Sequence, residues 1–311
     1  MSENTNTTKR RSAIQIMGSL IGLVKPLLHI MLAAIILGTL GYLCAIFLTI
    51  LAGQVIMHGL LTGVAGMIVP VDNMWRGFTP VKTIITIMIV IAVLRGILHY
   101  VEQYCNHFIA FKLLAIIRHK VFAALRKLCP AKLEGRDKGN LISIITTDIE
   151  LLEVFYAHTI SPIAIATLTS IIMVIFIGRY HWLAGVIALV AYLIVGVVIP
   201  MWNGKRGSQK GMEFRTNFGE LNSFVLDSLR GLDETIQYGQ GEKRKEQMSE
   251  RSKNLAGMQE SLSKMEGSQR SFTNMVILLA SFGMLALTIW LYDKGAMGFE
   301  GILTCTIAMM G

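Results

Sequence analysis

Long apolar stretches alternate with charged ones along this chain. Residues 26–71, 154–177, 182–202 and 272–292 contain no Lys, Arg, Asp or Glu. About twenty apolar residues in a helix are enough to cross the hydrocarbon core of a membrane. The pattern therefore predicts membrane-spanning helices in these four stretches and in 81–106, which begins directly after a proline suited to a first helical turn.

The stretch 26–71 is too long for one ordinary span, and the basic residues decide how to divide it. Of the 29 Lys and Arg, four lie in 1–25, eight in 112–150 and twelve in 203–271. Such clustering on alternate loops is the positive-inside pattern of membrane proteins. A single span at 26–57 places all three basic segments on the cytoplasmic side, whereas two spans would separate the first from the second.

Six spans joined by short outer loops and two long cytoplasmic hairpins account for the whole chain. The predicted spans are 26–57, 81–106, 154–177, 182–202, 272–292 and 299–311, and the hairpins are 107–153 and 203–271. Residues 1–25 form a polar tail and a short helix lying on the inner membrane surface. Thirteen residues of helix rise only about 20 Å, so the last span is expected to be truncated and the chain to be part of a longer protein.

Composition supports an all-α integral membrane protein. The chain is 53% hydrophobic and 16% charged, whereas soluble domains carry about 25% charged residues. The net charge of +9 follows from the basic cytoplasmic segments, so it predicts topology and excludes a nucleic-acid partner. The spacing of Cys and His predicts no metal site.

Both hairpins carry motifs that resemble a known family. The first has I-R-x-x-V-F-x-x-L at 117–125 and R-x-x-G-x-L-I-S-x-x-x-x-D at 136–148. The second has E-L-N-S-F-V-L-D-S-L-R-G-L at 220–232, followed by I-Q-Y-G at 236–239. These runs resemble the two intracellular loops of ABC exporter transmembrane domains. Within that family, C-P-A-K-L at 129–133 resembles the half-transporters that export cysteine and glutathione and are linked to cytochrome bd assembly.

The resemblance implies a dimer of six-span halves, in which spans 4 and 5 cross to the partner half. Each hairpin would end in a coupling helix that docks on a nucleotide-binding domain and relays ATP binding and hydrolysis into alternating access. Coupling helix 1 would include Leu133, Gly135, Arg136, Gly139, Asn140, Leu141 and Ser143. Coupling helix 2 would include Phe214, Arg215, Asn217, Phe218, Glu220 and Asn222. The implied partners are a second half-transporter, nucleotide-binding domains and the lipid bilayer of the cell (plasma or inner) membrane, with the N-terminus cytoplasmic.

The sequence itself contains no phosphate-binding loop of the form G-x-x-x-x-G-K-[ST] and no L-S-G-G-Q. We therefore expect no catalytic residues and no ATPase activity from this chain alone. ATP and magnesium would bind a nucleotide-binding domain, expected to follow the sixth span. An ion-coupled carrier, a channel and a non-transporting membrane scaffold are the alternative functions.

Arg95, His99 and Glu102 share one face of the span predicted at 81–106. Charged side chains inside a membrane usually face a cavity or an opposite charge. The three residues are either a polar wall of the transport pathway, suited to a zwitterionic or anionic substrate, or they form a pair that fixes packing, either between Arg95 and Glu102 or with another helix. In the preceding span, Gly38 and Gly41 are expected to allow close helix packing.

Overall fold

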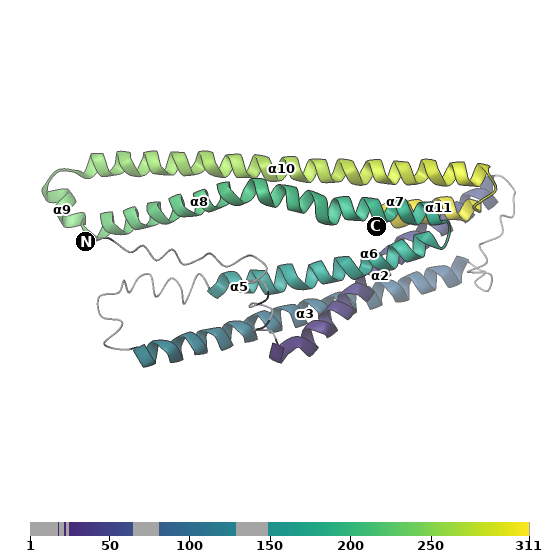
Figure 1. Cartoon of the computed structure of the whole chain (residues 1–311), viewed down its shortest axis with the longest axis horizontal. Helices are drawn as coiled ribbons and strands as arrows, with labels where there is room; N and C mark the ends of the chain where they lie inside the picture. The colour runs from purple at the N-terminus through teal and green to yellow at the C-terminus, as the bar shows by residue number, and fades with distance from the viewer. Residues whose placement is uncertain (1–17, 19–21, 23–24, 65–80, 129–148, 311) are drawn as a thin grey trace, which may run out of the picture. The chain divides into compact units, whose positions relative to one another are not determined.

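The computed structural model describes residues 25–64, 81–128 and 149–310, together with positions 18 and 22, and these residues form helices and tight turns. The all-α class predicted from the sequence is confirmed for them. The elements, shown in Figure 1, are η1 (Lys25–Leu27), α2 (Leu28–Val64), α3 (Val81–Leu128), α5 (Ile149–Phe155), η4 (Tyr156–Ile160), α6 (Ser161–Gly178), α7 (Trp182–Leu193), η5 (Ile194–Val198), α8 (Ile199–Arg230), α9 (Leu232–Gln237), α10 (Gly241–Asp293) and α11 (Phe299–Met310). Apart from positions 18 and 22, the predicted surface helix before residue 25 lies outside the described residues, as does the tip of the first hairpin.

Five helical stretches in the described residues are long and apolar enough to cross a membrane. They are Lys25–Met57, Thr83–Leu128, Tyr156–Gly178, Trp182–Arg230 and Gly241–Asp293. Each overlaps one of the first five predicted spans along nearly its whole length. The sixth predicted span corresponds to α11, a shorter apolar helix of 12 residues.

Two of the helices are far longer than a membrane requires. α3 has 48 residues and α10 has 53, which at 1.5 Å per residue gives lengths of about 70 and 80 Å. Because the hydrocarbon core is about 30 Å thick, each helix continues well beyond it. Apolar residues continue at helical spacing beyond the predicted span, at Leu113, Ile117 and Val121. This spacing predicts that the helix runs on past residue 106, and α3 is indeed continuous through Leu128.

The first predicted span, 26–57, agrees with the apolar stretch Lys25–Met57. The outer loop that we expected directly after this span begins later, because α2 continues to Val64. A glycine inside a helix costs only about 1 kcal/mol relative to alanine, so Gly59 and Gly63 did not stop it.

The chain divides into two compact units, residues 1–175 with 311 and residues 176–310. In the first unit, α2 packs against α3 through its small residues. A Cβ atom added at Gly41 would lie 3.6 Å from Cβ of Leu98, and one added at Gly38 would touch Ile165 and Glu102. The expectation that Gly38 and Gly41 allow close packing is confirmed.

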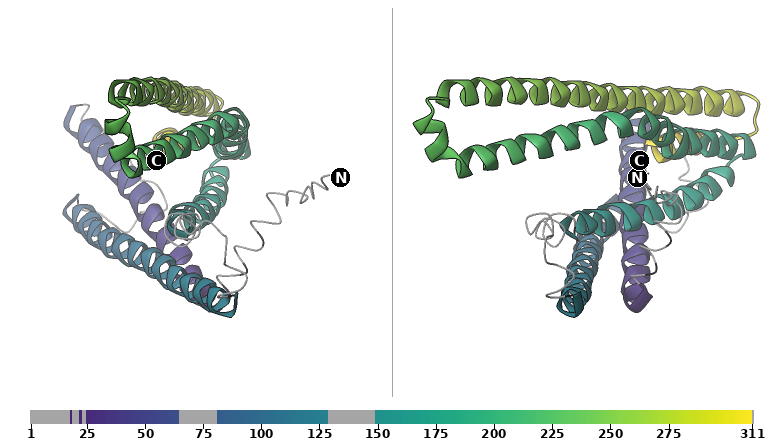
Figure 2. Two further views of the ribbon diagram at one scale, coloured as in Figure 1. Left: turned by 90° about the vertical axis from the view of Figure 1, so that its left-hand side faces the viewer. Right: turned by 60° about the vertical axis from the view of Figure 1, so that its left-hand side comes forward.

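The second unit packs α7, α10 and α11 around small and medium side chains. Ala188 of α7, Met284 and Thr288 of α10 and Cys305 of α11 are fully buried. Beyond this core, α8 and α10 lie side by side and antiparallel, with α9 joining their ends (Figures 1 and 2). The second predicted hairpin is thus a pair of extended helices.

Candidate functional site: the tip of the second hairpin

The tip of the second hairpin is a separate short helix, α9, held between two glycines. Gly231 ends α8 and donates its N–H to the carbonyl of Asp227 at 2.9 Å. At the other end Gly239 has φ of +63°, a left-handed conformation that glycine adopts without the steric cost of a Cβ. Gly239 donates to Ile236 at 3.1 Å and Gln240 donates to Thr235 at 2.9 Å, which is the Schellman pattern of helix termination. The chain therefore reverses in a well-defined turn.

Apolar side chains at this tip face outward. Ile236 is 69% exposed and Tyr238 is 73% exposed, and Leu229 and Leu232 are also exposed. We call these four residues the apolar tip. Contiguous exposed apolar residues on a protein surface typically mark a place where another molecule binds.

The two arms that carry the apolar tip are held together by side-chain contacts. Phe224 of α8 lies between two arginines of α10, with Cζ of Arg244 4.9 Å and Cζ of Arg251 4.8 Å from the centroid of its ring. Farther from the apolar tip, Nζ of Lys210 donates to Oγ of Ser261 at 3.3 Å. Cation–π contacts of this kind contribute about 0.5–1 kcal/mol each at exposed sites, so the pair is fixed at several points along its length.

The structure places all six residues predicted for coupling helix 2 inside α8, before the turn. Phe214 and Asn217 are partly buried, and the other four are exposed. Asn217 contacts Sδ of Met258 on α10 at 3.4 Å, so it belongs to the contact between the arms. The residues predicted for coupling helix 1, within 133–143, lie outside the described residues.

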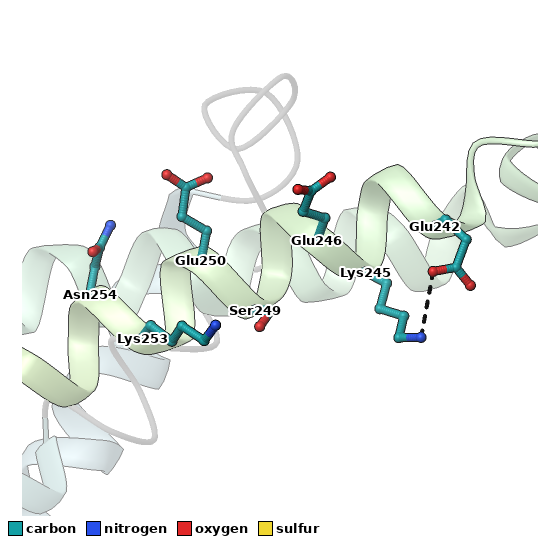
Figure 3. A pocket seen from close by; sticks show the side chains of 7 residues that line it. All are labelled: Glu242, Lys245, Glu246, Ser249, Glu250, Lys253 and Asn254. Atoms are coloured by element: carbon teal, nitrogen blue, oxygen red, sulfur yellow. Dashed lines mark ion pairs between the residues drawn. The ribbon is translucent and has the colours of Figure 1, made fainter.

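The stretch of α10 next to the tip carries alternating charges. Figure 3 shows Glu246 and Glu250 on one side of the helix and Lys245 and Lys253 on the other. Nζ of Lys245 pairs with Oε2 of Glu242 at 3.5 Å, and both side chains are highly exposed. Ion pairs between exposed side chains contribute little to folding stability in water. This face of α10 is therefore a solvated helix surface.

The arms of the first hairpin are joined by one exposed ion pair. Nη2 of Arg118 on α3 lies 3.2 Å from Oε1 of Glu150 on α5. Arg118 belongs to the first family-like motif. The pair is a weak contact between α3 and α5, because both side chains are exposed to solvent.

A buried polar cluster lies between α2 and α3. The carboxylate of Glu102, 3% exposed, accepts from Nδ2 of Asn106 and, at 3.1 Å, from Nε2 of Gln103. Nδ1 of His99 lies 3.2 Å from its Oε2. Gly38 of α2 provides the space, since Cγ of Glu102 lies 3.0 Å from where a Cβ would be. Glu102 is therefore a hydrogen-bonded packing point between helices.

The predicted trio of Arg95, His99 and Glu102 is only partly brought together. His99 pairs with Glu102, whereas the structure records no ion pair between Arg95 and Glu102. The Arg95 side chain is exposed on α3. The packing pair expected between Arg95 and Glu102 is replaced by one between His99 and Glu102, because these two lie one helical turn apart and Glu102 faces α2.

Sequence reasoning missed Gln103, Asn106 and α9. The glycines at 231 and 239 were a signal for α9, because they bracket a stretch of helical length. Among the described residues, no group of three or more His, Cys, Asp or Glu side chains could hold a metal ion.

Comparison with known proteins agrees with this architecture. The family model for the ABC transporter transmembrane region matches residues 27–311. A probable ABC transporter ATP-binding/permease protein of Haemophilus influenzae is 38% identical over 304 residues, which cover 97% of this chain and 52% of that protein.

More distant relatives differ in their named substrates. An ATP-dependent lipid A-core flippase of Shewanella denitrificans is 25% identical over 182 residues, 57% of this chain and 30% of the flippase. A glutathione/L-cysteine transport system ATP-binding/permease protein of Escherichia coli is 24% identical over 160 residues, 50% of this chain and 26% of that protein. The chain spans about half the length of the first of these relatives and less of the other two. On the match along residues 27–311, the chain belongs to the family of ABC transporter transmembrane regions.

Proposed function

We propose that this chain forms the membrane-spanning half of a dimeric exporter driven by ATP. The observation that carries the proposal is the α8–α10 hairpin, which extends far beyond a membrane and ends in the apolar tip. An ion-coupled carrier, a channel or a membrane scaffold would not require such a tip. Family membership supports the same choice.

The hairpin can act as a lever. α8 and α10 are continuous helices joined along their length by the contacts of Phe224 and Lys210. A packed pair of helices moves as a rigid body, so a displacement at one end is passed to the other. Closure of two nucleotide-binding domains would thus shift the membrane ends of α8 and α10 and switch the pathway between inward and outward access.

We place the docking segment at α9. Ile236 of α9 and Tyr238, which directly follows the helix, are the most exposed residues of the apolar tip, and burying them against a partner is favourable. The range 214–222 lies earlier along α8 and is partly occupied by contacts with α10. Residues 133–143 would form the corresponding docking segment of the first hairpin.

The remaining parts of the transporter would come from outside the described residues. A second half-transporter would complete the pathway. ATP and magnesium would bind the nucleotide-binding domain, in keeping with the names of relatives of which this chain spans about half. The protein would lie in the inner or plasma membrane with its N-terminus in the cytoplasm.

For the substrate we propose a small anionic or zwitterionic thiol, of the cysteine and glutathione class. The support is the sequence resemblance at 129–133 and the exposed cationic side chain of Arg95 on α3, which would face the pathway. The named substrates of the relatives also include lipid A-core. ATPase stimulation of the complete transporter in lipid vesicles by glutathione and cysteine, and not by lipid A, would support the thiol. The reverse result would favour a lipid.

The function is tested by charging the apolar tip of the complete transporter. Ile236→Asp places a carboxylate where we propose an apolar contact, so ATP-driven transport in vesicles should fall at least tenfold while the protein still folds. Leu226→Asp is the matched control, because Leu226 is an exposed leucine of α8 outside the tip. Equal transport by the two variants would contradict docking through α9.

A further inference from the structure

A cleft of about 610 Å³ lies between α8 and α10 at the end of the hairpin away from α9. Its lining includes Trp202, Asn203 and Arg206 from α8, and Ser261, Lys264 and Phe272 from α10. None of these residues belongs to the proposed docking segment.

One end of the cleft is aromatic and lies at the predicted membrane boundary. Trp202 is the last residue of the fourth predicted span and Phe272 is the first of the fifth. The structure brings their rings together, with centroids 6.4 Å apart and planes at 89°. Tryptophan is enriched where membrane proteins pass from lipid to water, so this contact marks the level of the lipid headgroups.

The other end of the cleft is charged and polar. Arg206 lies one helical turn beyond Trp202, and its Cζ is 4.8 Å from the centroid of the Trp202 ring. Nζ of Lys264 pairs with Oε1 of Glu260 at 2.7 Å. Both side chains are exposed, so this pair is weak and the Lys264 ammonium can also donate to a further acceptor. The guanidinium of Arg206 makes its recorded contact with a ring, so its N–H donors can bind an acceptor entering the cleft.

We propose that this cleft binds the phosphate headgroup of an acidic glycerophospholipid from the inner membrane leaflet. The phosphate would accept hydrogen bonds from Arg206 and Lys264, since arginine matches phosphate oxygens with two parallel donors. Asn203 and Ser261 provide partners for the glycerol and headgroup oxygens, and the acyl chains would leave past Trp202 and Phe272. The bound lipid would brace α8 against α10 where the hairpin enters the membrane.

An acidic lipid fits the charges better than a zwitterionic one. The lining carries Arg206 and Lys264 against the single carboxylate of Glu260, which leaves a net positive charge for the phosphate and no second acidic group for a choline. The proposal depends on where the membrane lies and not on transport, so it can fail or hold independently of the proposed function.

Native mass spectrometry of the complete transporter tests the site. Phosphatidylglycerol and phosphatidylcholine are titrated separately onto the delipidated protein. Replacing both Arg206→Gln and Lys264→Gln should weaken phosphatidylglycerol binding roughly thirtyfold, from the attraction of two cations to an acidic lipid. The matched control removes two positive charges near the tip, Arg230→Gln with Lys243→Gln, and should change binding less than twofold. Arg206→Lys, which keeps the charge but loses the two parallel donors, should weaken binding less than the double variant does.

Three results would overturn the proposal. One is equal phosphatidylglycerol binding by the cleft variant and its control, and another is equally tight binding of phosphatidylcholine. The third is displacement of phosphatidylglycerol by water-soluble glycerol 3-phosphate, which would make the cleft a site for free anions.

Discussion

Gly38 should tolerate no larger side chain, because α2, α3 and α6 meet there. A Cβ at this position would touch Cδ1 of Ile165 and lie 3.0 Å from Cγ of Glu102. A leucine must then displace both neighbours. Overpacking of this kind costs about 1–3 kcal/mol, and leucine's better helix propensity returns about 0.8 kcal/mol. The expected net effect of Gly38→Leu is a loss of up to about 2 kcal/mol.

Gly96 provides the matched control for Gly38. It lies within α3 of the same unit, and a Cβ added there would meet nothing within 4 Å. Gly96→Leu should therefore keep the propensity gain without the collision, and be neutral or stabilising.

Thermal unfolding of the purified protein in one detergent compares the two glycine variants. For a protein of this size a loss of about 2 kcal/mol corresponds to a fall of several degrees in Tm. We expect that fall for Gly38→Leu and none for Gly96→Leu. A Gly38→Leu protein as stable as the parent would refute the close approach of α2 to Glu102.

Three further variants test other parts of the structure. Glu102→Leu leaves the buried amide of Asn106 without its carboxylate acceptor and should cost about 1–3 kcal/mol. Glu102→Gln, which keeps an acceptor, should cost less in the same unfolding assay, and equal losses would contradict the hydrogen-bond explanation. Gly239→Ala forces a Cβ into the left-handed conformation at φ +63°, at about 1–2 kcal/mol, so amides of 231–240 should exchange faster with D₂O. Gly241→Ala, with open space around it, should leave that exchange unchanged. Arg118→Ala removes an ion pair whose partners are 45% and 60% exposed, so after solvent screening we expect a loss below about 0.5 kcal/mol. A larger loss in unfolding experiments would indicate that Arg118 has a further role.

The helices could be predicted from the sequence because their signals are local. Long apolar stretches without charged residues predicted the spans. The spacing of Leu113, Ile117 and Val121 continued the helical period past the membrane, and α3 follows it to Leu128. The glycines after Met57 were a weaker indication of where the helix ends, because a helix supported by packing overcomes the cost of about 1 kcal/mol for a glycine.

Neither the position of the turn in the second hairpin nor the partner of Glu102 could be predicted from the sequence. Both depend on contacts between segments that are distant along the chain. Residues 214–222 and 232–237 are both polar, helical stretches, and only the folded hairpin shows that the chain reverses at the second. Glu102 lies at helical spacing from both Arg95 and His99. Its pairing with His99 was decided by the face that packs on Gly38 of another helix.

The central claim is that α9 is the part of this chain that docks on a nucleotide-binding domain. A photo-reactive maleimide on the thiol of an Ile236→Cys variant, in an otherwise cysteine-free complete transporter, tests it directly. Asn222→Cys, an exposed position in the range first predicted for docking, is the comparison. We predict that light cross-links the Ile236→Cys protein to the nucleotide-binding domain and leaves the Asn222→Cys protein largely unlinked. Cross-linking from Asn222→Cys alone would contradict the account and return the docking segment to 214–222.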